Sequence, residues 1–193
     1  MERVGKARLT HSCHGAMLVG VAGRAGCGRS ALSAALGGDL PACRFQDCES
    51  LQELNLEPNV GFCLIVAFDV TNALSFQVAS SLLAECLAAN AAMKPQAVLL
   101  VGTKFDLSYK RAVAIREAEN VATKSSVLFV ECSALTGFNL QSVVRILRLA
   151  QEEGEQQQQQ QQLSQKGVQT LKPLGLAQLT PNELLFPPPS LLE

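Results

Sequence analysis

A short apolar run that leads directly into a glycine-rich turn constrains the fold of this chain more than any other feature. Residues 17–22 are apolar or glycine, and Gly23-x4-Gly28-Arg29-Ser30 follows. This is the phosphate-loop pattern G-x-x-x-x-G-K-[ST] with Arg in place of Lys. Glycines let successive backbone N–H groups point inward as an anion nest, and a helix that starts there adds its positive dipole end. The stretch predicts a strand, a phosphate-binding loop and a helix; a glycine turn without a ligand is the alternative.

The side chains of this loop have separate expected roles. The Ser30 hydroxyl is of the type that ligates Mg²⁺, and Arg29 keeps the positive charge of the usual Lys. Its guanidinium is planar and bulkier than an ammonium group. The expected phosphate-binding residues are Gly23, Gly26, Cys27, Gly28, Arg29 and Ser30.

Apolar runs and helical patterns alternate along the rest of the chain. Continuous apolar runs predict buried strands, and apolar residues at i, i+3, i+4 and i+7 predict helices. The expected strands cover residues 16–22, 42–46, 62–68, 97–102 and 127–131, and the expected helices cover 29–37, 73–91, 111–123 and 139–152. Such alternation predicts an α/β fold of three layers, with a mostly parallel sheet between helices. In such sheets ligands bind beyond the carboxyl ends of the strands.

Composition excludes several classes of protein. The chain is 48% hydrophobic and 17% charged with a net charge of −1, which favours a sizeable core and gives no basic surface for nucleic acid. Its seven cysteines are scattered, mostly within apolar runs, which indicates reduced thiols in a cytoplasmic protein. His11, Cys13 and His14, with Cys43 and Cys48, match no zinc spacing well. Neither a signal peptide nor a membrane span is predicted.

The composition also divides the chain into three parts. Residues 1–14 are expected to be a flexible lead-in and 15–152 a folded domain. Seven glutamines at Gln156–Gln162 and three prolines at Pro187–Pro189 mark residues 153–193 as a disordered tail. Within this tail, Leu179–Phe186 is either a short partner-binding segment or an unselective apolar patch.

Three further segments follow predicted strands and carry a family resemblance. They are Phe68-Asp-Val-Thr-Asn72, Thr103-Lys-Phe-Asp106 and Glu131-Cys-Ser-Ala-Leu-Thr-Gly137. With the glycine loop, they resemble the Ras-like small GTPases over residues 16–150. The resemblance implies binding of GTP or GDP with Mg²⁺. It also implies that Asp106 accepts hydrogen bonds from two N–H groups of guanine, while the remaining expected guanine contacts are Thr103, Lys104, Ser133, Ala134 and Leu135.

The chain departs from this family after the first helix. Only sixteen residues separate Ser30 from Asp47, and eight of these, 39–46, lie beyond the helix. The family's effector loop and β-hairpin need more residues than that. The family's Mg-binding Thr is also missing, because no Thr lies between Ser30 and Asp47. The first switch and the edge strand are therefore expected to be absent or vestigial.

The second switch is altered as well. Asp47 aligns with the Asp of the family's D-x-x-G-Q, so Ser30 and Asp47 are the expected metal residues, although this alignment rests on Asp47 alone. Ser50 and Leu51 then replace the Gly that meets the γ-phosphate and the Gln that orients water. Ala25 stands where many members have Gly. Asp69 is open to two interpretations, as a residue at the entry of the following helix or as a second candidate Mg anchor.

These departures predict a guanine-nucleotide-binding protein with weak or absent hydrolysis that acts through protein partners in trafficking or signalling. No cysteine for prenylation lies near the C-terminus and residue 2 is Glu, so no direct membrane anchor is expected. One alternative is a nucleotide-free pseudo-GTPase that serves as a scaffold subunit through its open sheet edge. The other is a P-loop ATPase or small kinase.

Overall fold

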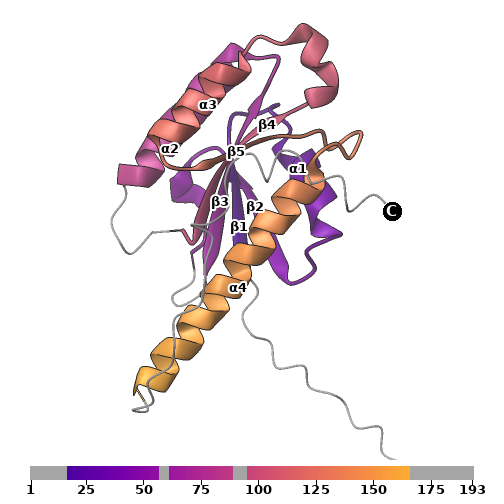
Figure 1. The fold of residues 1–193 in the computed structure, drawn as a ribbon. Helices are drawn as coiled ribbons and strands as arrows, with labels where there is room; N and C mark the ends of the chain where they lie inside the picture. The colour runs from indigo at the N-terminus through magenta and orange to yellow at the C-terminus, as the bar shows by residue number, and fades with distance from the viewer. Residues whose placement is uncertain (1–16, 57–60, 89–94, 166–193) are drawn as a thin grey trace, which may run out of the picture.

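The strands expected from the apolar runs lie side by side in one parallel sheet (Figure 1). The structure is a computed structural model that describes residues 17–56, 61–88 and 95–165. In these residues the strand order is β2-β1-β3-β4-β5, and every neighbouring pair is parallel. The strands are β1 (Met17–Ala22), β2 (Cys43–Cys48), β3 (Phe62–Asp69), β4 (Ala97–Thr103) and β5 (Leu128–Glu131).

Helices cover both faces of this sheet, which confirms the predicted α/β architecture. The helices are α1 (Arg29–Gly37), α2 (Ala73–Ala88), α3 (Ile115–Lys124) and α4 (Leu140–Gln165), with short 3₁₀ helices η1 (Leu51–Glu53) and η3 (Phe105–Lys110). One buried cluster contains residues of α1 and α4, and another contains residues of α2 and α3. The lead-in at 1–14, the end of the predicted helix 73–91 and the tail from 166 onward lie outside the described residues.

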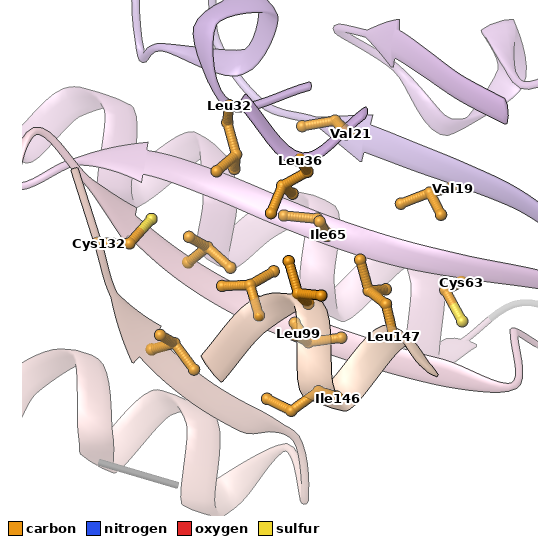
Figure 2. Close-up of a cluster of buried hydrophobic side chains, with 14 of the residues drawn as sticks. Val19, Val21, Leu32, Leu36, Cys63, Ile65, Leu99, Cys132, Ile146 and Leu147 are labelled. Carbon is orange, nitrogen blue, oxygen red and sulfur yellow. The ribbon is translucent and has the colours of Figure 1, made fainter. Parts of the chain in front are cut away.

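Aliphatic side chains build the core, as the scarcity of aromatic residues requires. On the α1/α4 face, Leu32 and Leu36 of α1 meet Ile65 of β3, while Leu147 of α4 points into the same cluster (Figure 2). All four side chains are fully buried. Removing a side chain of this size from water contributes about 1.5–3 kcal/mol. This packing fixes the strands, so the loops at their carboxyl ends are held in place.

On the side of β1, the sheet ends at β2, and the described residues add no further strand there. The spacing of Ser30 and Asp47 predicts this loss of a strand. Helix α1 ends at Gly37 and β2 begins at Cys43, so the connection contains no room for a further hairpin. Strand β2 pairs with β1 from Met17↔Cys43 to Ala22↔Cys48, and in the described residues it has no neighbour on its other side. The predicted trimming of the sheet at this edge is confirmed.

Helix α4 is much longer than the predicted helix 139–152. It continues to Gln165 and contains the whole glutamine run, so the prediction of a disordered tail from residue 153 is wrong for residues 153–165. Figure 1 shows the helix running past the strands. Glutamine is a good helix former, and a helix that has already nucleated on the core gains one hydrogen bond for each residue added.

The predicted helix 111–123 begins four residues late, at Ile115. The preceding residues are held in another conformation because the N–H groups of Ala112 and Val113 donate to the carbonyl of Val70 at 2.9 and 3.2 Å. Arg111 also forms a two-pronged ion pair with the buried Glu131, at 2.6 and 2.8 Å. Tertiary contacts therefore override the helical pattern at these positions.

The six cysteines of the described residues are free thiols, in agreement with the expected reduced state. Burial raises the pKa of Cys63 and of Cys132 to about 12. We expect iodoacetamide at mildly alkaline pH to leave these two thiols unmodified in the folded protein, because about a thousandfold less thiolate is present than for an ordinary thiol. In urea both should react, as peptide mass spectrometry would show. Modification of Cys63 without unfolding would contradict this prediction.

Candidate functional site

Three loops that follow parallel strands meet at the carboxyl edge of the sheet. The glycine loop, residues 23–30, follows β1 and leads into α1. Loop 103–106 follows β4, and loop 133–138 follows β5. The register pairs Ala22 with Cys48 and Asp69 with Thr103, so these strands end side by side. The arrangement is the one that the sequence predicted.

The glycine loop has the backbone shape that the motif requires. Gly26 and Gly28 have φ of +80° and +96°, values that side chains with a Cβ rarely adopt. A Cβ added to Gly23 would lie 2.4 Å from the carbonyl oxygen of Ala67, whereas nothing lies within 4 Å of one added to Gly26. The loop is therefore packed against β3 on one side and open on the other, as a backbone cradle for an anion must be.

A buried threonine joins the glycine loop to the sheet. Thr103 Oγ1 lies within hydrogen-bond distance of the carbonyl oxygens of Cys27 and Phe68, and its one proton can be donated to either. Both Thr103 and Cys27 are buried. Thr103 is expected at the base and Cys27 at the phosphates. The contact between them therefore links the predicted base loop directly to the predicted phosphate loop.

Lys104 makes a second connection between these loops. Its Nζ donates to the carbonyl of Gly26 at 2.7 Å and to Asp69 Oδ2 at 2.7 Å. The other oxygen of Asp69 accepts from the backbone N–H and the hydroxyl of Thr71, at 2.8 and 2.7 Å. Asp69 is thereby engaged by its own neighbours at the turn before α2, which supports the interpretation as a helix-entry residue over that of a metal anchor.

The acidity of Asp69 follows from these contacts. Burial acts to raise the pKa of this carboxyl, but the hydrogen bonds from Lys104 and Thr71 outweigh it and the pKa is lowered. A lowered pKa stabilises the folded protein above the pKa of the unfolded chain, and this contribution disappears as the pH falls through the folded value. We expect Asp69→Asn to destabilise the protein at pH 7 and to have less effect below about pH 4. Urea unfolding across this range tests the prediction; a cost independent of pH would contradict it.

Asp106 is held in place by the loop 133–138. Ser133 Oγ donates to Asp106 Oδ1 at 2.5 Å, and the N–H of Thr136 donates to Ser133 Oγ at 3.2 Å. Ser133 is buried, whereas Leu135, two residues further on, is 84% exposed. The carboxylate of Asp106 therefore has a fixed orientation and an oxygen, Oδ2, that remains available to a ligand.

Two phenylalanines that the motifs did not single out join the same loops. The rings of Phe105 and Phe138 stack with centroids 4.3 Å apart and planes inclined by 10°. Stacked aromatic pairs contribute about 0.5–1.5 kcal/mol beyond the area that they bury. Their positions, Phe105 within the segment Thr103–Asp106 and Phe138 directly after the segment Glu131–Gly137, were the only signal in the sequence.

Arg29 and the metal residues depart from the predicted arrangement. The guanidinium of Arg29 donates to the carbonyl of Cys48 and pairs with Glu49 at 3.0 Å, instead of lying over the cradle. Asp47 Oδ1 accepts from Ser33 at 2.5 Å and not from Ser30. Ser33 lies about one helical turn beyond Ser30, because three residues advance a helix by about 4.5 Å. Within the described residues, Asp47 is thus hydrogen-bonded to Ser33, and the metal site at Ser30 and Asp47 stays a prediction.

The residues present fit a guanine nucleotide better than they fit a metal. The oriented Asp106 and the open backbone cradle suit a base and an anion. Asp47, one of the oxygen donors expected for Mg²⁺, is engaged by Ser33, and the described part of the chain holds no cluster of three or more His, Cys, Asp or Glu that suits a metal ion. We therefore derive no chemical step through Mg²⁺.

A comparison with protein families agrees with this geometry. A model of the Ras family matches residues 49–152, slightly more than half of the chain. The chain belongs to the Ras family. The match includes the loops of Asp106 and Ser133, and it begins after the glycine loop, whose assignment rests on its own sequence and shape. The resemblance stated from the sequence is thereby confirmed. Within the described ranges, no helix is both long and apolar enough to cross a membrane.

Proposed function

We propose that this Ras-family protein binds guanine nucleotides, GDP or GTP, and hydrolyses GTP weakly or not at all. The observation that carries the proposal is the fixed carboxylate of Asp106, which accepts a hydrogen bond from Ser133 at 2.5 Å. A carboxylate accepts from both the ring N–H and the exocyclic amine of guanine, whereas adenine has no such pair of donors. Lys104, anchored to Gly26 and Asp69, places its alkyl stem beside the same loop.

The segment after β2 supports the absence of efficient hydrolysis. Ser50 caps η1 by accepting from the N–H of Gln52 at 3.3 Å, and Leu51 is buried. When Asp47 is aligned with the Asp of the family's D-x-x-G-Q, Ser50 stands in place of the Gly and Leu51 in place of the Gln. Neither side chain can do at the γ-phosphate what the family's residue does. Loss of water positioning and charge stabilisation costs orders of magnitude in rate. In this proposal the protein acts in the cytoplasm through protein partners, without a chemical cycle of its own.

The nucleotide content of the purified protein tests this function. We expect GDP or GTP to be released on denaturation and identified by chromatography. Protein with Asp106→Ala should carry none, whereas Glu119→Ala, on the exposed face of α3, should carry as much as the wild type. Wild-type protein without nucleotide that also fails to bind added GDP would refute the proposal. Competition by ATP as strong as that by GTP would favour the ATPase alternative.

One observation favours a second candidate, the nucleotide-free scaffold. Arg29 already has a carboxylate partner in Glu49, and this contact occupies the basic side chain of the glycine loop. A scaffold of this kind should be stable without ligand and should purify as part of a larger assembly. A rise of several degrees in the melting temperature with GTP and Mg²⁺ would exclude it, because only a ligand that binds the folded state stabilises it.

A further inference from the structure

The guanidinium of Arg29, which the motif places at the phosphates of a nucleotide, is already bound to two groups of the protein. The side chain of Arg29 is only 14% exposed, and its two terminal nitrogens are used separately, one on the carbonyl of Cys48 and one on Glu49 Oε1. A lysine ammonium is a single compact charge, whereas the planar guanidinium spans a carbonyl and a carboxylate at once. This gives a physical reason for Arg in place of Lys at this position.

Glu49 is itself positioned by the segment that carries it. Its backbone N–H donates to Glu53 Oε2 at 3.2 Å. The side chain of Gln46 on β2 then binds this segment at two points, donating to the carbonyl of Glu53 at 2.6 Å and accepting from the N–H of Asn55 at 3.1 Å. Glu49 is therefore held near Arg29 by the fold and not by its side chain alone.

We propose that Glu49 takes the place of a nucleotide phosphate on Arg29, so that this side chain adds little to the affinity of the protein for the phosphates of a guanine nucleotide. The inference rests on the proposed function. An arginine shared between a carbonyl and a carboxylate must leave both partners before it reaches a phosphate. The phosphates then meet the backbone N–H groups and the N-terminus of α1 without the guanidinium of Arg29. Glu49 is a positioning residue in this scheme, because it acts on the ligand only through Arg29.

The test compares the affinities of GDP and guanosine, measured by calorimetry in EDTA so that Mg²⁺ contributes nothing. In the wild type, the preference for GDP over guanosine, expressed as the ratio of the two affinities, should come from the backbone N–H groups of the glycine loop and the N-terminus of α1, without a contribution from Arg29. Glu49→Gln should raise this ratio by about three- to fivefold, the size expected from freeing one partner of a half-exposed ion pair. Glu119→Gln, at an exposed site on α3, should leave it unchanged.

Guanosine itself separates a phosphate effect from damage to the fold. Its affinity should be the same in the wild type and in Glu49→Gln, because it has no phosphate; a structural role of Glu49 would change both ligands equally. Adding Arg29→Ala to Glu49→Gln should return the ratio to the wild-type value. A ratio that Glu49→Gln does not change would overturn the inference and leave the proposed function intact. Failure to bind either ligand would instead refute the proposed function.

Discussion

Asp106→Asn should transfer the preference of this protein from guanine to xanthine nucleotides. The carboxylate offers two acceptors to the two N–H donors of guanine, whereas the amide offers one acceptor and one donor. Xanthine has a ring N–H beside a carbonyl, which matches the amide. Because a hydrogen bond to a charged group contributes about 1.5–3 kcal/mol, GDP affinity should fall by about ten- to more than a hundredfold.

Competition binding with GDP and xanthosine diphosphate measures this exchange. The control is Glu119→Gln, which removes a charge on the exposed face of α3 and should leave both affinities unchanged. A gain for xanthine together with the loss for guanine cannot arise from unfolding, so the experiment separates base recognition from stability. Equal GDP affinity in the wild type and in Asp106→Asn would show that this carboxylate does not contact the base.

The fold was largely predictable because glycines and apolar runs determine it locally. The predicted helix 29–37 matches α1 from Arg29 to Gly37, since a glycine turn precedes it and two glycines end it. The apolar run 62–68 predicted β3, which in the structure is one residue longer and ends at Asp69. The spacing between Ser30 and Asp47 predicted a trimmed edge because chain length limits what can be built.

The candidate site was predictable in its residues but not in all of its contacts. The sequence shows that residue 29 carries a positive charge. The direction of the Arg29 side chain, however, depends on Glu49, which lies twenty residues further along the chain, after β2. The resemblance predicts a metal pair of Asp47 and Ser30, and in the structure Asp47 accepts a hydrogen bond from Ser33. Such contacts between distant elements are set by packing and not by local pattern. The same holds for the stacking of Phe105 on Phe138.

The length of α4 was missed for a different reason. Low-complexity glutamine is typical of disordered segments, but disorder in such a segment depends on whether a folded element precedes it. Val143, Val144, Ile146 and Leu147 anchor the first turns of α4 in the core. The glutamines then extend an existing helix and need not nucleate one, which is the costly step.

Leu147→Ala should be among the most destabilising substitutions in the chain, and it tests whether α4 is part of the core that holds the site. Leu147 is fully buried between α4 and the sheet, so its truncation removes apolar contacts and leaves a cavity (Figure 2). Substitutions of this kind cost about 2–5 kcal/mol. Urea unfolding measures the loss as a lower midpoint with an unchanged slope.

Leu87→Ala is the matched control for this prediction, because Leu87 lies on α2 and is 50% exposed. It should change the free energy of unfolding by less than about 0.5 kcal/mol. The remaining folded fraction of Leu147→Ala should bind GDP as the wild type does, because Leu147 lies on α4 and not in any of the ligand loops. If the two substitutions cost the same, α4 would not be packed against the sheet. The placement of Ser133, in the loop that precedes α4, and of its partner Asp106 would then have to be reconsidered.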